Sequence, residues 1–381
     1  MYAPVRNARE LFVFMAYHRL ISASYPAFSA GYKNPLYIAV LCMLKYFRSE
    51  WEGDGKMADI IGSATRYRQS DETIRKMTER AFGKAEDFSA KEMSGGFFSA
   101  VYLVEANGEK YVLKLAADDA VKVMRHEKDY IPTEAKMLRM FNEKTDIPMP
   151  KLLYFDDSRD ICKVPYFFMS YIDGKPLCET QGLTDGQISD IKREMGVITR
   201  KMCSIKMPHY GVPALPETFT DKNSEFTVGL FEMLVRDAEE KDIEIPSISG
   251  DELMSLICSQ SAVLDAADAP CCAHTDTWDG NIMVRDGKLV GLIDFAAVYY
   301  ADPLMSHDFH DFGSGPREDF LEGFGKSGFD RSERIRIQIY KLWQQLGMVV
   351  ERGYRCYEDS NLYDWVLDVF ANEDGVLKKM I

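Results

Sequence analysis

The feature that most constrains this chain is a short hydrophobic hairpin pattern with a polar residue at each end. Residues 282–284 and 289–293 have the composition of strands, and the pair Asp286-Gly287 between them is a strong turn signal. A two-stranded hairpin brings its two ends together. Asn281, before the first strand, and Asp294, after the second, are therefore predicted to be neighbours that can share a metal ion.

Two further polar residues precede this hairpin, in the run His274-Thr-Asp276-Thr-Trp-Asp-Gly-Asn281. An acid that can accept a hydroxyl proton is followed by an Asn and then by a strand-end Asp. This order is the one that kinase-type phosphoryl transfer uses, with Asp276 as the base and with Asn281 and Asp294 as Mg²⁺ ligands. Each residue alone is more often ordinary turn chemistry, so the prediction depends on the ordered set.

A small-residue turn lies further upstream, between two expected strands. Gly95-Gly96 precedes an alternating apolar segment, Asn107-Gly108 is a second hairpin signal, and the return strand ends near Lys114. Glycines let main-chain N–H groups approach phosphates, and a strand-borne lysine reaches the phosphates as a point charge. Alone, the glycine pair would indicate a plain hairpin turn. No Walker A pattern occurs, so a P-loop enzyme is unsupported.

A helix is expected after this sheet, because Pro132 suits a first helical turn and an apolar face follows it. Glu134, in the first turn of that helix, is the predicted partner of Lys114, and Glu127 is the alternative. An acid at a helix start can also simply face solvent, where the helix dipole favours it.

The next hydrophobic segment, residues 164–172, is predicted to be a buried strand that ends at Asp173-Gly174. In a two-lobed nucleotide-binding enzyme, the main chain of Ser170, Tyr171 and Ile172 would meet the adenine. Core packing is the alternative explanation for Tyr171.

Together these motifs resemble the aminoglycoside phosphotransferase family, within the wider choline-kinase-like and fructosamine-kinase-like group of small-molecule kinases. The resemblance covers residues 77–381. The matching segments are Gly95-Gly96-Phe97, Val112-Leu-Lys114, Glu134, Ile147-Pro-Met-Pro150, Met169-Ser-Tyr-Ile-Asp-Gly174, His274-Thr-Asp276, Asn281, Ile293-Asp294-Phe295 and Ala301-Asp302-Pro303.

The resemblance implies an α+β, two-lobed, protein-kinase-like fold. It implies a small N-lobe with an antiparallel sheet and one helix, and a larger, mainly helical C-lobe. It also implies ATP and Mg²⁺ as cofactors, Lys114 on the ATP phosphates, Asp276 and His274 as catalytic residues, and Asn281 and Asp294 on the metal. Asp302 would begin a helix that buttresses the catalytic loop.

The chain departs from the family pattern at several places around these motifs. Thr275 stands before Asp276 where the family usually has Gly or Trp, and Thr277 stands after it where the family usually has Leu. Ser306 replaces a common acid, and Cys203 replaces a frequent His. The base and metal positions are unaffected, so the departures concern the acceptor and the rigidity of the loop.

The first part of the chain differs in composition from the rest. Residues 1–48 carry six Lys and Arg, one acid and ten aromatics, whereas the whole chain has a net charge of −14. We expect residues 1–70 to be a helical extension, 71–172 the N-lobe and 173–381 the C-lobe. The apolar runs of the extension are too short to span a bilayer, and a basic aromatic contact with lipid head groups is the weaker alternative.

The acidic balance argues against a nucleic-acid partner, because phosphate binding needs a basic surface. The eight cysteines show no C-x-x-C spacing, which together with the ATP requirement favours a reducing, cytoplasmic setting. The expected partner is a small-molecule hydroxyl acceptor, such as an aminoglycoside-type antibiotic, a sugar, an amino alcohol or a fructosamine-like metabolite. Glu351, Asp308 and Asp311 are candidate contacts to a cationic acceptor, or else solvated acids.

Two other functional classes fit the sequence less well. A protein kinase would need a long segment after Asp294, yet Asp302-Pro303 follows only eight residues later. A non-catalytic nucleotide-binding regulator would be expected to lack Asp276, Asn281 or Asp294, and all three are present.

Overall fold

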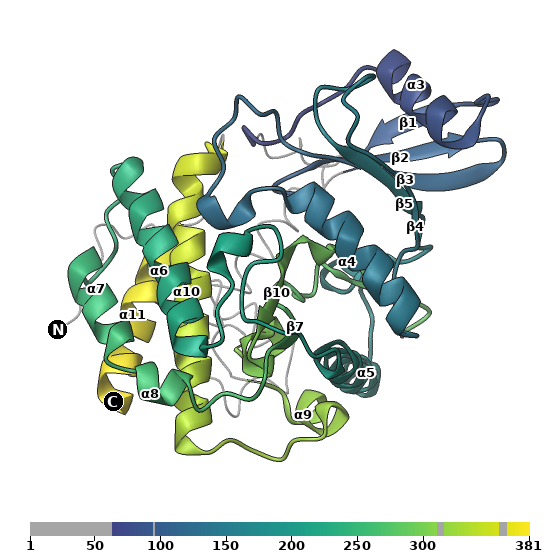
Figure 1. Ribbon diagram of the computed structural model, residues 1–381. Helices are drawn as coiled ribbons and strands as arrows, with labels where there is room; N and C mark the ends of the chain where they lie inside the picture. The colour runs from purple at the N-terminus through teal and green to yellow at the C-terminus, as the bar shows by residue number, and fades with distance from the viewer. Residues whose placement is uncertain (1–62, 94–95, 311–315, 358–363) are drawn as a thin grey trace, which may run out of the picture.

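The computed structural model describes residues 63–93, 96–310, 316–357 and 364–381. The predictions for residues 1–62, the turn residue Gly95 and the candidate acceptor contact Asp311 lie outside the described residues. Figure 1 shows a smaller lobe built on a sheet and a larger lobe built mainly of helices, in agreement with the predicted α+β, two-lobed architecture.

The smaller lobe is a five-stranded antiparallel sheet with the strand order β1-β2-β3-β5-β4. Its strands are β1 (Ser89–Glu92), β2 (Ala100–Ala106), β3 (Glu109–Leu115), β4 (Leu152–Asp156) and β5 (Tyr166–Ser170). The predicted Asn107-Gly108 turn joins β2 to β3, and both residues have the left-handed backbone, with φ of 57° and 77°, that this turn requires.

Two helices pack on this sheet, one on each face. Helix α3 (Asp71–Phe82) begins at the N-cap Ser70 and buries Ile74 and Met77 against the outer face. Helix α4 (Tyr130–Lys144) covers the inner face, where Val112 and Phe167 join the core that continues into the larger lobe. Helix α4 begins two residues before Pro132, so Glu134 lies two residues further into the helix than expected, in its second turn.

The larger lobe is built mainly of helices. These are α5 (Asp185–Ser204), α6 (Asn223–Glu240), α7 (Gly250–Cys258), α8 (Ser261–Leu264), α9 (Glu318–Phe324), α10 (Arg331–Arg355) and α11 (Asp364–Met380). Two small sheets lie among them, β6-β8-β9 and β10-β7. Their strands are β6 (Lys175–Pro176), β7 (Cys271–His274), β8 (Ile282–Arg285), β9 (Lys288–Leu292) and β10 (Val298–Ala301).

Short 3-10 helices fill the connections of both lobes. They are η2 (Arg125–Glu127), η3 (Leu177–Glu179), η4 (Pro216–Thr218), η5 (Phe295–Ala297), η6 (Pro303–Met305) and η7 (His307–Phe309). Asp302 caps only the single turn η6, which replaces the longer buttressing helix that the resemblance implied. The buttress itself comes from α10, because Arg336 and Tyr340 of that helix both donate to the Asp302 carboxylate.

Helices α5 and α9 approach each other closely through two glycines. A Cβ atom at Gly196 would lie 2.1 Å from the main-chain oxygen of Phe320, and one at Gly323 would lie 1.9 Å from that of Arg193. Real Cβ contacts are much longer than this, so the two helix backbones can pack at this distance only where both residues are glycine.

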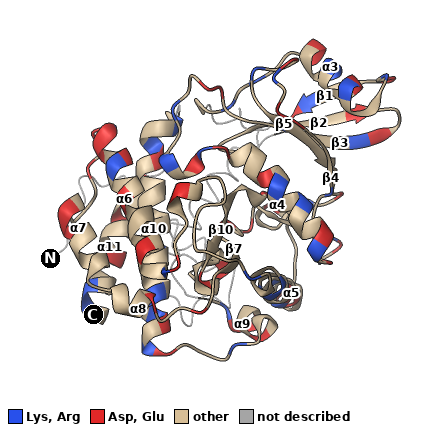
Figure 2. Ribbon diagram, in the orientation of Figure 1, with Lys and Arg blue, Asp and Glu red and all other residues tan. Residues whose placement is uncertain are grey.

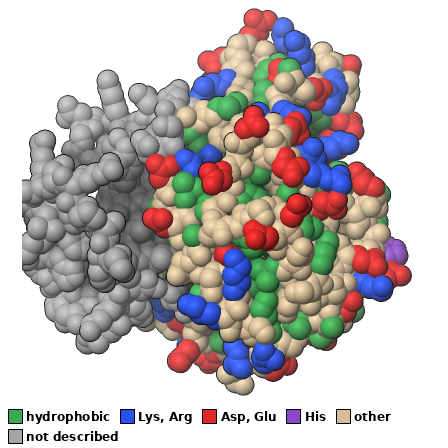
Figure 3. Space-filling model, turned by 90° about the vertical axis from the view of Figure 1, so that its left-hand side faces the viewer, with side chains coloured by type: hydrophobic (Ala, Val, Ile, Leu, Met, Phe, Trp, Pro, Cys, Tyr) green, Lys and Arg blue, Asp and Glu red, His purple; other side chains and the backbone are tan. Residues whose placement is uncertain are grey.

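Charged residues lie mainly on the outward surfaces of the helices, and strands β7 and β10 at the centre of the larger lobe carry none (Figure 2). On the face seen in Figure 3, acidic and basic side chains alternate with small hydrophobic groups. A search of the described residues finds no helix with the length and apolar character needed to cross a membrane.

Candidate active site

The predicted hairpin is present, and it is the element that assembles the site. Strands β8 and β9 pair in antiparallel fashion, and Asp286 and Gly287 make the turn with φ of 52° and 73°. At the open end of the hairpin, the N–H of Ile293 donates to the main-chain oxygen of Asn281 at 3.0 Å. This bond brings Asn281 and the chain just before Asp294 side by side.

Asn281 also holds Asp276 in place. Its Nδ2 donates to the main-chain oxygen of Asp276 at 2.8 Å and to the carboxylate Oδ2 at 3.0 Å. Because the amide nitrogen of Asn281 is directed at Asp276, the amide oxygen is the atom of this side chain that has the chemistry of a metal ligand.

His274 contacts the main chain of the same loop. It is fully buried at the end of β7, and its Nδ1 accepts the N–H of Asp276 at 3.2 Å. Burial lowers the pKa of His274 to about 4, so the ring is neutral and acts as an acceptor. The structure therefore gives His274 a contact to the main chain of Asp276. This places it as a support for the candidate base.

Lys114 joins the two lobes at this point. Its Nζ lies 2.7 Å from the Glu134 carboxylate and 2.8 Å from the Asp294 carboxylate. Burial acts to lower the pKa of Lys114, but the charges of Asp294 and Glu134 outweigh it and raise that pKa. The predicted contact between Lys114 and Glu134 is thus present, whereas the alternative partner, Glu127, instead forms a buried ion pair with Arg355.

Asp294 has an unusual backbone for a residue other than glycine. Its φ and ψ are 66° and 69°, in the left-handed region, which costs about 1 kcal/mol or more for such a residue. This conformation turns the chain directly after β9 and starts η5. The Glu134 carboxylate accepts the N–H of Phe295 at 3.2 Å, so Glu134 contacts both Lys114 and the residue after Asp294.

The surroundings of Asp276 shift the pKa of its carboxyl group. Burial, followed by the charge of Asp294, raises the pKa of Asp276 well above the usual range of an aspartate, and Glu351 of α10 adds to this effect. Burial likewise raises the pKa of Glu351 to about 7. The sequence offers Glu351 as a candidate contact to a cationic acceptor or as a solvated acid, but its effect on Asp276 comes from the fold, because the two residues are far apart in sequence.

The other predicted residues are distributed around this centre. Ser170 ends β5, where its side chain accepts the N–H of Lys151 at 2.9 Å, and Tyr171 and Ile172 continue into the connection between the lobes. Gly96 lies in the connection between β1 and β2. Asp308 is buried, and its carboxylate accepts a hydrogen bond from the Thr277 hydroxyl, so Asp308 supports the loop that carries Asp276.

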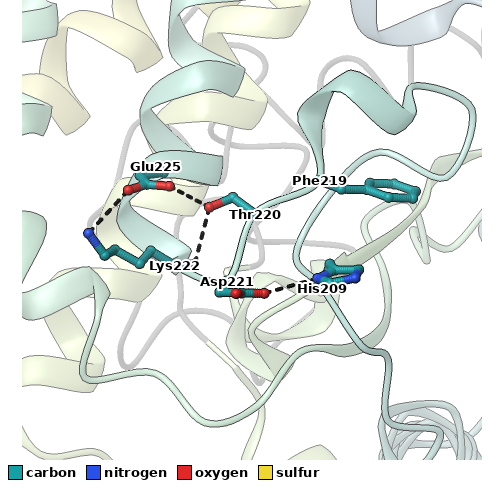
Figure 4. A pocket seen from close by; sticks show the side chains of 6 residues that line it. All are labelled: His209, Phe219, Thr220, Asp221, Lys222 and Glu225. Atoms are coloured by element: carbon teal, nitrogen blue, oxygen red, sulfur yellow. Dashed lines mark hydrogen bonds and ion pairs between the residues drawn. The ribbon is translucent and has the colours of Figure 1, made fainter.

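A separate surface hollow of about 520 Å³ contains none of these residues. It is lined by His209, Phe219, Thr220, Asp221, Lys222 and Glu225 (Figure 4). His209 forms a hydrogen bond with Asp221, and Lys222 forms an ion pair with Glu225, so these four side chains already have partners within the hollow.

Comparison with known proteins identifies the family. Residues 89–334 match the family model described as the phosphotransferase enzyme family, which is well over half of the chain. The chain belongs to the phosphotransferase enzyme family. The matched segment contains Lys114, Glu134, Asp276, Asn281 and Asp294. No curated protein matches the chain.

Solved structures with a similar fold extend the comparison. A putative fructosamine-3-kinase from Haemophilus somnus 129PT aligns with a TM-score of 0.59 at 12% identity, covering 81% of this chain and 97% of the other. A putative aminoglycoside phosphotransferase from Ralstonia eutropha JMP134 aligns with a TM-score of 0.57 at 14% identity, covering 82% and 99%.

A third similar structure is the streptomycin-ATP-APH(2")-IIa ternary complex, with a TM-score of 0.54 at 16% identity and coverage of 80% and 97%. At these identities the likeness shows the fold. Family and fold together make this phosphotransferase a small-molecule kinase.

Proposed function

We propose that this enzyme transfers the γ-phosphate of Mg-ATP to a hydroxyl group of a small molecule that carries amino groups, as aminoglycoside-type antibiotics do. The observation that carries the proposal is the arrangement of Asp276, Asn281 and Asp294 in one cleft with Lys114. This arrangement has a base, two oxygen ligands and a phosphate-binding cation, which together make up the parts that phosphoryl transfer needs.

Each residue of the site has a separate proposed role. Lys114, oriented by Glu134, would hold the phosphates of ATP, and the turn that contains Gly96 would cover them with main-chain N–H groups. Asp276 would accept the proton of the attacking hydroxyl, within a loop ordered by His274 and Asn281. The main chain of Ser170 to Ile172 would meet the adenine.

The donor set fits Mg²⁺. The Asn281 amide oxygen and the Asp294 carboxylate are hard oxygen ligands, and Mg²⁺ usually takes one or two such groups together with phosphate oxygens and waters. The described residues hold no group of three or more His, Cys, Asp or Glu that would bind a metal by itself, which agrees with a site completed by the nucleotide. When bound, the ion would neutralise the charge on the phosphates.

An amino-bearing acceptor is supported by Glu351. Its carboxylate lies close enough to act on the pKa of Asp276, and it accepts a hydrogen bond from the Tyr357 hydroxyl at 3.1 Å. An acid beside the base would attract a cationic substrate and orient its hydroxyl. The solved APH(2")-IIa complexes contain streptomycin and gentamicin, which is consistent with this class.

Two alternatives remain in the same cleft. A sugar, amino alcohol or fructosamine-like metabolite would use the same base and metal ligands, and the similarity to fructosamine-3-kinase structures favours it. A non-catalytic nucleotide-binding regulator is the second.

A cytoplasmic location suits this enzyme, because the proposed reaction uses ATP and the seven described cysteines are all free.

The test is a coupled ADP-release screen of the purified protein with Mg-ATP against aminoglycosides, macrolides, sugars, amino alcohols and fructosamines. The Asp276→Asn variant is the matched control, because it preserves shape and removes the base. Acceptor-dependent ADP release by the wild type but not by the variant supports the proposal. Binding of Mg-ATP without turnover on any acceptor supports the regulator.

A further inference from the structure

The segment that precedes α3, residues 63–69, lies against the turn between β1 and β2. We call it the N-terminal strap. It lies in the part of the chain that the sequence alone groups with the extension. The side chain of Thr65 is buried and donates to the main-chain oxygen of Phe98 at 2.7 Å. This contact joins residues 33 positions apart, so the strap is packed on the turn.

Arg66 makes the larger contribution to this contact. Its side chain is only 1% exposed. One guanidinium nitrogen donates to the main-chain oxygen of Gly96 at 2.8 Å and the other to that of Met93 at 3.0 Å. The second nitrogen also lies 3.0 Å from the Glu92 carboxylate. The planar fork of an arginine can span two such oxygens at once, whereas the point charge of a lysine does not match this geometry.

The strap is itself fixed at its other side. The N–H of Ala64 donates to the main-chain oxygen of Arg355, at the end of α10, at 2.8 Å. The Arg355 guanidinium lies 4.8 Å from the centre of the Phe98 ring, and it forms a buried ion pair with Glu127. The strap therefore connects the turn to the helix that carries Glu351.

Holding the carbonyls determines where the neighbouring N–H groups point. A trans peptide unit is planar, with its N–H directed opposite to its C=O. Because the Gly96 and Phe98 oxygens are bound by the strap, the N–H groups of Phe97 and Ser99 are directed away from it. A turn that covers phosphates benefits from N–H groups whose direction is fixed before the nucleotide arrives.

We propose that Arg66, assisted by Thr65, is a positioning residue for the nucleotide phosphates: it orients the main-chain N–H groups of Phe97 and Ser99, which lie between β1 and β2. The inference rests on the proposed use of ATP, and it adds a residue that lies before the segment matched by the family model. Burying a guanidinium costs free energy, and burial lowers the pKa of Arg66. The three acceptors around it offset that cost.

The test compares the binding of Mg-AMP-PNP and of adenosine to the full-length protein by calorimetry. Arg66→Ala and the charge-conserving Arg66→Lys are each expected to weaken Mg-AMP-PNP binding about tenfold, the effect of losing one or two net hydrogen bonds. Thr65→Val is expected to weaken it about threefold. Adenosine binding should be unchanged in all three, because adenosine has no phosphates for the turn to hold.

Arg68→Ala is the matched control. Arg68 belongs to the same strap and pairs with the same Glu92 carboxylate, but its side chain is 52% exposed and it donates only to that carboxylate. Its variant should bind both ligands as the wild type does. Arg66→Lys and Thr65→Val keep the charge or the volume, so they serve if Arg66→Ala does not fold.

Wild-type affinity for Mg-AMP-PNP in both Arg66→Lys and Thr65→Val overturns the inference. An equal loss for adenosine and Mg-AMP-PNP also overturns it, because that result indicates general damage to the lobe. A wild-type protein that binds adenosine but shows no gain from the phosphates overturns the proposed use of ATP, and the inference with it.

Discussion

The side chain of Asn281 bonds to Asp276 twice, at 2.8 Å to its main-chain oxygen and at 3.0 Å to its carboxylate. One amide group therefore sets both the path of the loop and the direction of the acid. The candidate metal ligand and the candidate base are thus one structural unit, and a substitution of Asn281 would disturb both. Substitutions of Asp276 are the cleaner test of the base.

We expect Asp276→Asn to lower kcat by a factor on the order of 10² or more with an accepted substrate, because a positioned base and its charge are both lost. Binding of Mg-ATP should largely survive, since Lys114, the proposed phosphate ligand, is unchanged in this variant. The measurement is steady-state ADP release together with nucleotide titration. Unchanged turnover in this variant would show that another group accepts the proton.

Lys114→Ala should raise the KM for ATP, because the phosphates lose their proposed cation. It should also lower the stability, because Lys114 is buried and its removal leaves the buried Glu134 carboxylate without its partner. Glu134→Gln should shift the same parameter less, since Lys114 remains and keeps its contact with Asp294. Lys110→Ala is the matched control, because Lys110 lies on the same strand and pairs with Glu105 in solvent. A normal ATP dependence in Lys114→Ala would assign the phosphates to another cation.

Asp302→Ala should destabilise the fold by about 3–5 kcal/mol, because it leaves Arg336 buried without its carboxylate at 2.8 Å and deprives Tyr340 of an acceptor. Urea unfolding at pH 7 measures the change. Asp190→Ala, at an exposed ion pair with Arg193, is the control and should cost less than about 1 kcal/mol. Equal effects of the two substitutions would show that α10 does not depend on this contact.

Glu351 provides a prediction on pH. Its pKa is raised from 4.5 to about 7, so between these values the folded protein keeps a proton that the unfolded chain has lost. The free energy of unfolding should therefore fall as pH rises from about 4.5 to about 7, and level off above. Relative to Glu351→Gln, which does not titrate, the decrease should be on the order of 1–3 kcal/mol.

Urea unfolding of both proteins at pH 5 and pH 8 checks this, because the difference between them cancels the other titrating groups. Tyr357→Phe adds a second arm: its hydroxyl donates to Glu351 and lowers the pKa of that carboxyl, so its loss should steepen the decrease. If the free energy of unfolding of the wild type, relative to that of Glu351→Gln, stays constant or rises between pH 5 and pH 8, the raised pKa of Glu351 is contradicted.

The sequence predicted the hairpin from 282 to 293 well because its signals are local. Strand composition and an Asp-Gly turn decide its geometry without help from the rest of the chain. The choice between Glu134 and Glu127 was less secure, since both acids come before or early in one helix. Glu127 is bound by Arg355, 228 residues later, and no local pattern contains that information.

Long-range contacts account for the remaining differences. The helix expected after Asp302 is a single turn, because Arg336 and Tyr340 of α10 take over the support of that carboxylate. The strap was equally hidden, since the sequence groups Arg66 with the expected N-terminal extension. Only the fold brings its guanidinium to the oxygens of Met93 and Gly96.

The glycine contact between α5 and α9 has a consequence for reading substitution data on this enzyme. Any side chain at Gly196 or Gly323 would meet main-chain atoms of the opposite helix, and main chain cannot rotate out of the way as a side chain can. In a saturation library, both positions would score as intolerant as Asp276 when growth is the readout. Measured by cellular abundance instead, the glycine variants would be depleted and the Asp276 variants retained. Such a pair of readouts would separate the residues that maintain the scaffold from those that carry out the reaction.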